Sequence, residues 1–133
     1  MDLKIHHIGY AVPDVAKAEY EFGVLGWKTC SGVTDDTVRQ VRIVFMERDG
    51  HRIELVAPLS ASSPINKILS RGSGTPYHIC YEVPSLEAAE AELKKARFIP
   101  FKKAAEASAI GGRRVEFMYA KQVGVIELVE SEK

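Results

Sequence analysis

Hydrophobic and polar positions along the chain follow two periods, one typical of strands and one typical of helices. Period-two alternation recurs through the first half, and a helical pattern follows Pro13-Asp14, which suits a first helical turn. The expected elements are a strand at 5–12, a helix at about 15–25, a short strand at 27–33, a turn at 34–36 and strands at 38–47 and 52–57. Asp49-Gly50 supplies the positive φ of a hairpin turn. The first half is therefore predicted to be β-α-β-β-β.

The second half predicts the same order of elements. They are a strand at 77–83, a helix at about 86–96 capped by Ser85, a strand at 98–102, a small-residue loop at 103–112 and strands at 113–120 and 123–129. Residues 109–112 of that loop have the composition of a mobile lid. The stretch between the halves is rich in Ser, Gly and Pro, and it contains one predicted short helix at 64–70.

Three phrases recur in the same order in both halves. His7-Ile8-Gly9-Tyr10 returns as His78-Ile79-Cys80-Tyr81, which is 71 residues further along (78 − 7). The phrase Ile-Glu-Leu-Val closes each half, and the two remaining phrases are Arg42–Met46 and Arg114–Met118. Self-similarity at a fixed period indicates a tandem duplication. We therefore expect an α+β fold made of two tandem βαβββ modules.

Alternation places four polar residues away from the helices. In 52–56 and 123–129, the Ile and Leu residues point to the helix side, and Glu54 and Glu127 point to the opposite face. His7 and His78 also lie opposite the Ile residues that follow them. If the two sheets curl towards each other, the four side chains converge in one cleft. Two imidazoles and two carboxylates suit a divalent metal with positions open for water or substrate.

Composition narrows the class of protein. The 133 residues carry 18 Lys and Arg against 18 Asp and Glu, so no net charge indicates nucleic acid or an anionic membrane as a partner. No apolar run approaches the ~20 residues of a spanning helix, and the N-terminus lacks the pattern of a signal peptide. Cys30 and Cys80 have no CxxC spacing, and both are expected to be buried free thiols. A cytoplasmic protein is the resulting expectation.

The repeated phrases and the His/Glu positions resemble the vicinal oxygen chelate superfamily, which includes glyoxalase I, methylmalonyl-CoA epimerase, extradiol dioxygenases and bleomycin-resistance proteins. The resemblance covers the whole chain. It implies one domain at 1–133, with module 1 at about 4–57, a linker with a short helix at 58–74 and module 2 at about 75–130. It also implies a curved sheet cleft around one metal, with His7, Glu54, His78 and Glu127 as ligands.

The complete ligand set resembles the isomerase branch more than the iron dioxygenases, which use two His and one Glu. Epimerases commonly carry Phe-Leu-His-Pro before the last strand, where this chain has Phe117-Met118-Tyr119-Ala120. The first expectation is thus a metal-dependent lyase or isomerase of glyoxalase I (lactoylglutathione lyase) type, with methylmalonyl-CoA epimerase as the alternative. A non-catalytic protein that binds a small molecule or antibiotic is the alternative from another class.

The resemblance also implies roles for individual residues. Glu127 is the first choice for the catalytic base, and Glu54 is the second. Arg42 and Arg114 are expected on the same strand faces as the ligands, where either could bind the anionic tail of a thiol-adduct or thioester substrate. The ion would be Ni, Co, Mn or Zn. Members of the superfamily often form dimers, so a homodimer is expected, with the cleft built within one chain or across two.

Overall fold

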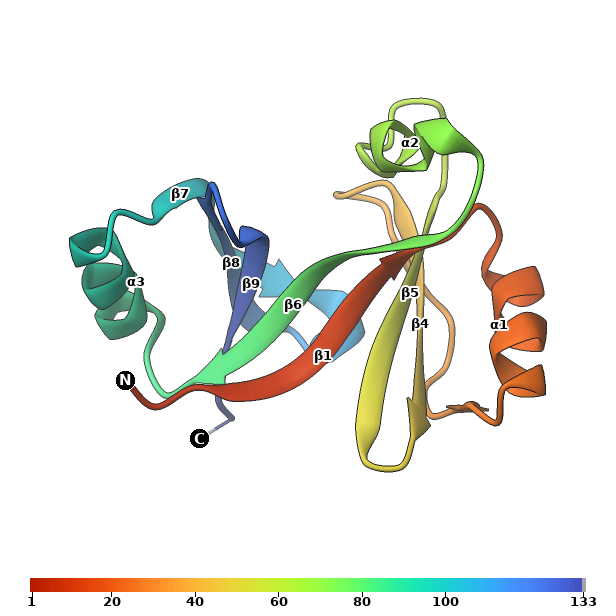
Figure 1. Cartoon of the computed structure of the whole chain (residues 1–133), viewed down its shortest axis with the longest axis horizontal. Coiled ribbons are helices and arrows are strands. Elements are labelled where there is room, and N and C mark those ends of the chain that lie inside the picture. Colours follow the sequence, from red (N-terminus) through yellow and green to blue (C-terminus); the bar gives the residue numbers. More distant parts are fainter. Residues whose placement is uncertain (133) are drawn as a thin grey trace. The chain divides into compact units, whose positions relative to one another are not determined.

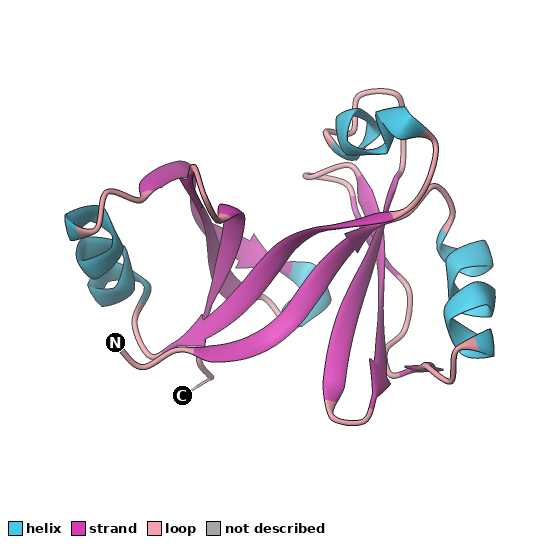
Figure 2. Ribbon diagram, in the orientation of Figure 1, coloured by secondary structure: helices cyan, strands magenta, loops and turns pink. Residues whose placement is uncertain are grey.

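The computed structural model describes residues 1–132, apart from the side chain of Lys103. The chain forms two compact units, which we call the first unit (residues 7–77) and the second unit (residues 1–6 and 78–133). Strands dominate both units, and helices α1 and α3 each lie against the strands of their own unit (Figures 1 and 2). None of the helices in the described part of the chain has the length and hydropathy needed to cross a membrane.

The first unit has β5 at the centre of its sheet. Strand β1 (Lys4–Ala11) runs parallel to β5 (His51–Pro58), and β4 (Val41–Arg48) pairs antiparallel to the other edge of β5. Two short strands, β2 (Lys28–Thr29) and β3 (Thr34–Asp36), pair with β4. Helix α1 (Val15–Val24) starts where the Asp14 side chain accepts a hydrogen bond from the Lys17 amide at 2.9 Å. The hydrophobic core between α1 and the sheet of the first unit is one cluster that includes Val15, Val44, Met46, Ile53 and Leu55.

The second unit repeats this arrangement. Strand β6 (Thr75–Val83) runs parallel to β9 (Gly124–Glu130), β8 (Arg113–Ala120) is antiparallel to β9, and β7 (Ile99–Ala107) is antiparallel to β8. Helix α3 (Leu86–Lys95) is capped by Ser85, whose Oγ accepts a hydrogen bond from the Ala88 amide at 3.2 Å. The strand order β6-β9-β8-β7 matches β1-β5-β4-β2 in both sequence and direction. The predicted duplication and the α+β class of two βαβββ modules are confirmed.

Registers confirm the predicted faces of the strands that end each unit. Ile8 pairs with Ile53, and Ile79 pairs with Ile126. Ile53 and Leu55 belong to the core under α1, and Ile126 and Leu128 belong to the core under α3. Because side chains alternate along a strand, the intervening glutamates point away from the helices. The hairpin between β4 and β5 has Asp49 at φ 51° and Gly50 at φ 80°, the positive values that a two-residue turn requires.

Two local predictions were wrong. Thr34–Asp36 is not a turn, because these residues pair with Val41–Ile43 as strand β3. Residues 103–107 are not loop, because β7 continues to Ala107 opposite Arg113. Only the short 3-10 helix Ser108–Ile110 and the left-handed Gly111 and Gly112 remain of that loop, and a lid there stays a prediction.

The linker and the cysteines complete the description. The predicted short helix is α2 (Ile65–Ile68), which continues as the 3-10 turn η1 (Leu69–Arg71). Cys80 is a buried free thiol as predicted. Cys30 is exposed, contrary to prediction, because it lies just beyond the two-residue strand β2 at the edge of the sheet.

Candidate metal centre

The first unit holds a buried histidine and glutamate side by side. His7 is 1% exposed and Glu54 is 5% exposed. Their Nε2 and Oε1 atoms are 3.4 Å apart. Phe45, which pairs with Glu54 across β4 and β5, meets the His7 ring edge-on at 5.3 Å between centroids. The parallel pairing of β1 with β5 therefore sets an imidazole and a carboxylate together on the face opposite α1.

The second unit builds the same arrangement. His78 and Glu127 are both buried, and their Nε2 and Oε1 atoms are 3.0 Å apart. Phe117 pairs with Glu127 across β8 and β9, and it meets the His78 ring edge-on at 5.8 Å. The parallel pairing of β6 with β9 places Glu127 opposite Cys80, two residues along the strand from His78. Each unit thus contains the His–Glu pair that the sequence predicted.

The chemistry and spacing of each pair fit a divalent metal. Nitrogen and carboxylate ligands bind such ions at about 2.0–2.2 Å, so two ligand atoms on one ion are separated by roughly 3.0–3.5 Å. The two observed separations, 3.4 and 3.0 Å, lie in this range. An imidazole and a carboxylate are also costly to bury in an apolar sheet unless a partner stabilises them. Each pair is therefore a possible metal-binding His/Glu cluster.

The two arginines are not on the ligand faces, which corrects the prediction. Arg42 shares its face of β4 with Val44 and Met46, which pack into the core under α1. Its guanidinium hydrogen-bonds both carboxylate oxygens of Asp35, at 2.7 and 3.1 Å. Arg114 points to the helix side of β8, where it pairs with Glu87 of α3 at 3.0 Å and with Glu130 at 3.3 Å. A substrate role for either arginine remains a prediction.

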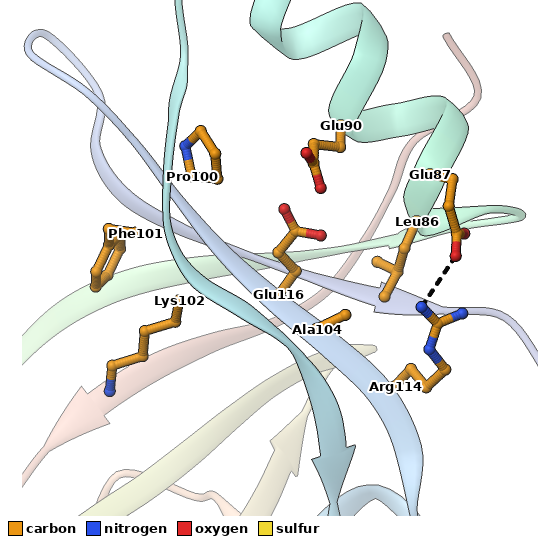
Figure 3. A pocket seen from close by; sticks show the side chains of 9 residues that line it. All are labelled: Leu86, Glu87, Glu90, Pro100, Phe101, Lys102, Ala104, Arg114 and Glu116. Atoms are coloured by element: carbon orange, nitrogen blue, oxygen red, sulfur yellow. Dashed lines mark hydrogen bonds and ion pairs between the residues drawn. The ribbon is translucent and has the colours of Figure 1, made fainter.

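The structure shows a buried carboxyl that the sequence analysis did not single out. Glu116 of β8 is 3% exposed and lies on the helix side, like Met118, away from Glu127. It borders a cavity of about 480 Å³ between α3 and strands β7 and β8, where its carboxyl group faces that of Glu90 (Figure 3). The repeat offered a signal for this residue, because Glu116 stands where the first unit has Val44.

The two carboxyl groups share a hydrogen bond that needs one proton. Burial, and then the hydrogen bond with Glu90, raise the pKa of Glu116 to about 7. The same hydrogen bond, followed by the neighbouring Lys94, lowers the pKa of Glu90. The shared proton therefore resides on Glu116, which donates to the Glu90 carboxylate. This pair lies on the opposite face of the sheet from the His–Glu pair of its unit.

Comparison with known proteins gives the class of the chain. Residues 6–117 match the model of the Glyoxalase/Bleomycin resistance protein/Dioxygenase superfamily. The chain therefore belongs to this superfamily, the vicinal oxygen chelate proteins, as the repeated phrases predicted.

Several similar proteins within the superfamily are epimerases. The chain is 33% identical to the mitochondrial methylmalonyl-CoA epimerase of Mus musculus over 98% of its own length and 72% of that protein. Among solved structures, a hypothetical protein from Bacillus halodurans C-125 has a TM-score of 0.87 at 27% identity and covers 100% of this chain and 97% of its own. A selenomethionine-labelled methylmalonyl-CoA epimerase has a TM-score of 0.83 at 25% identity, with 100% and 99% covered. These similarities indicate an isomerase, and they favour the epimerase alternative over glyoxalase I.

Proposed function

We propose that this chain is a divalent-metal-dependent isomerase of methylmalonyl-CoA epimerase type. The observation that carries the proposal is the 33% identity to a methylmalonyl-CoA epimerase over 98% of the chain. A buried His–Glu pair in each unit supports it, because such pairs provide both metal ligands and a base. Because two of the three similar proteins named above are methylmalonyl-CoA epimerases, glyoxalase I is the second candidate.

In this proposal His7, Glu54, His78 and Glu127 hold one divalent ion. The ion would polarise the carbonyl oxygen of the thioester and so stabilise negative charge beside the carbon that loses its proton. The burial of the four side chains favours this stabilisation of negative charge, because charge interactions are stronger where water is excluded. The proposal requires that both pairs bind the same ion, so the expected stoichiometry is one metal per chain.

The proton is moved by a glutamate carboxylate. The carbon between a thioester carbonyl and a carboxylate is acidic enough for a carboxylate within hydrogen-bond reach to remove its proton. Epimerisation then requires that a proton return to the opposite face of the planar, delocalised anion. Glu127 is our first choice for the base and Glu54 the second, as the resemblance implied. Two carboxylates of equivalent origin could each serve one face.

The ordering of the proposed functions is tested by assaying two substrates in parallel. Protein reconstituted with Co²⁺, Ni²⁺, Mn²⁺ or Zn²⁺ is incubated in D₂O with one epimer of methylmalonyl-CoA, and deuterium incorporation and epimer composition are followed by NMR and chiral chromatography. The same samples are assayed with the hemithioacetal of methylglyoxal and glutathione. We expect turnover of methylmalonyl-CoA that chelator abolishes and metal restores. Turnover of the hemithioacetal alone would overturn the proposal in favour of glyoxalase I.

Three further expectations accompany this proposal. The two modules would constitute one functional domain over 1–133, with substrate entering as a soluble acyl thioester. The protein would be a homodimer, which sedimentation at several concentrations can test. A cytoplasmic location is consistent with this function and remains a proposal.

A further inference from the structure

One row of side chains runs across three strands of the second unit on the face that carries the His–Glu pair. Lys102 of β7 pairs with Phe117 of β8, and Phe117 pairs with Glu127 of β9. Paired residues on neighbouring strands project to the same side of a sheet. With strands spaced about 4.8 Å apart, Lys102 lies roughly 10 Å from Glu127 along the row. A long, flexible lysine side chain at this distance can reach a ligand held beside Glu127.

Phe117 connects the lysine to the histidine of the pair. The Lys102 Nζ atom lies 5.6 Å from the centroid of the Phe117 ring, and the Phe117 ring lies edge-on to His78. Phe101 packs beside Phe117 at 5.9 Å between centroids. The result is a partly open aromatic surface with an ammonium group over it, adjoining the buried imidazole.

The ammonium group is available for an external anion. Among the described residues, no carboxylate lies within ion-pairing distance of Lys102, and its side chain extends away from Glu90 and Glu116 (Figure 3). Its basic neighbours on β8 differ in this respect, because Arg113 pairs with Glu82 and Arg114 pairs with Glu87. An ammonium near an aromatic face also retains partial stabilisation while its donors stay open.

At the position that corresponds to Lys102, the first unit has no cation. Across from Phe45 the neighbouring residue is Cys30, whose amide donates a hydrogen bond to the Phe45 carbonyl at 2.9 Å. The side chain at that place is a small, uncharged thiol instead of an ammonium. Lys102 is therefore a charge difference between the units on this face. Another is Arg52 of β5, which stands where the second unit has Val125 and lies close enough to Cys30 to oppose the rise that burial causes in the pKa of its thiol.

We propose that Lys102 binds the anionic oxygens of the acyl-thioester substrate and so determines which way round the substrate lies relative to the two pairs. This inference rests on the proposed function and deepens it. The anion is either the carboxylate of the acyl group or a phosphate of the thiol carrier, which present the same oxygen chemistry to an ammonium. Phe117 and Phe101 provide the apolar surface against which the lysine stem and the uncharged part of the substrate lie.

The test compares Lys102→Met, which keeps an apolar stem over Phe117, with Lys102→Arg, which keeps the charge. Lys121→Met is the matched control, because Lys121 is an exposed lysine in the turn between β8 and β9. We expect Lys102→Met to lower kcat/KM for methylmalonyl-CoA about 10-fold, as loss of a charge-assisted contact to the substrate would. Lys102→Arg should restore most of the loss, and added salt should weaken the parent more than Lys102→Met.

A second substrate distinguishes the two sources of the anion. Methylmalonyl-pantetheine keeps the acyl carboxylate but lacks the phosphates of the carrier. An effect of Lys102→Met that persists with this substrate assigns Lys102 to the acyl carboxylate, and an effect that vanishes assigns it to a phosphate. An active parent with equal kcat/KM in Lys102→Met and Lys121→Met would overturn the inference and leave the proposed function standing. A parent that turns over neither thioester would overturn both.

Discussion

The two units share a strand order and a His–Glu–Phe arrangement, yet they differ at two positions that the duplication makes equivalent. Next to Phe45 the first unit has Cys30, whereas Lys102 is next to Phe117 in the second unit. On the helix side the first unit has the apolar Val44, whereas the second unit has the carboxyl of Glu116. Both departures from symmetry place a Lys or Glu side chain in the second unit where the first unit has Cys or Val.

This difference separates two kinds of residue in a duplicated fold. Residues that would ligate a single ion benefit from symmetry, because equivalent strands present equivalent donors. An epimerase substrate is not symmetric, since its reacting carbon carries a thioester on one side and a carboxylate on the other. Side chains that distinguish the two ends must therefore occur in one unit only. Lys102 meets this condition on the ligand face of the sheet, and Glu116 does not, because it lies on the helix side.

The largest expected effect comes from comparing the two glutamates. If Glu127 is both ligand and base, Glu127→Gln keeps an oxygen ligand and loses the basic site, so turnover should fall about 10²–10⁴-fold while metal affinity falls modestly. Glu54→Gln should reduce turnover less. Steady-state turnover and metal content of both variants decide this. Nearly normal turnover in Glu127→Gln with an inactive Glu54→Gln would assign the base to the first unit.

The histidines provide the next largest effect. Loss of a direct ligand should weaken metal binding by more than the ~10–100-fold that loss of a hydrogen-bond partner to a ligand typically causes. His7→Ala and His78→Ala should therefore weaken binding to similar degrees, and the double variant should retain no stoichiometric metal in elemental analysis. His51→Ala is the control, because His51 is an exposed histidine at the start of β5. Metal retained in the double variant would exclude the shared four-ligand site.

How far the sequence could predict the structure differs between strands. Faces of β5 and β9 were predictable, because Glu54 and Glu127 are each flanked by Ile and Leu and only one face is apolar. The face on which Arg42 lies could not be predicted. Because β4 is buried on both sides from Ile43 to Met46, alternation does not show which of its two sets of side chains faces the helix.

Two other features depended on tertiary contacts. The end of β7 was missed because its Lys, Ala and Glu residues have low strand propensity, and pairing with β8 overrides that preference. The contact of Glu116 with Glu90 requires α3 to lie against β8, which no local pattern reveals. The ligand pairs were predictable because the repeat states each residue twice, whereas Lys102 and Glu116 lack a counterpart in the other unit.

Replacing Val44 by Glu, the residue that the second unit has at the equivalent position, should destabilise the first unit. Val44 is 1% exposed and packs in the apolar cluster under α1 with Val15, Met46 and Leu55. Val44→Glu should therefore lower the free energy of unfolding by about 3–5 kcal/mol at pH 7.5, as an uncompensated buried charge does. Val44→Thr, which has nearly the same shape, serves as the control for a buried polar group. Urea unfolding measures both, and a Val44→Glu variant as stable as the parent would show that the first unit also accommodates a carboxyl.

The smallest expected effect concerns Glu116 and the pH dependence of stability. Its pKa is raised from 4.5 to about 7 in the folded chain by burial and by the neighbouring Glu90 and Glu87 of α3, while Lys94 of α3 opposes this rise. As pH rises from about 4.5, the unfolded chain releases this proton while the folded chain keeps it, so stability falls until pH passes about 7. Between pH 5 and pH 7.5 the loss should be about 2 kcal/mol from Glu116 alone. The lowered pKa of Glu90 affects stability at more acidic pH, because its pKa in the folded chain lies below the ordinary value.

Urea unfolding at pH 5 and pH 7.5 can test this prediction in three proteins. Glu116→Gln stays uncharged at both values, so it should lose less stability than the parent across this interval and be the more stable protein at pH 7.5. Glu106→Gln, which alters an exposed glutamate of β7, should follow the parent. Because Glu116 lies on the face opposite Glu127, the kcat of Glu116→Gln should remain close to that of the parent at pH 7. Identical pH dependence in Glu116→Gln and the parent would mean that Glu116 does not keep, in the folded chain, a proton that the unfolded chain releases.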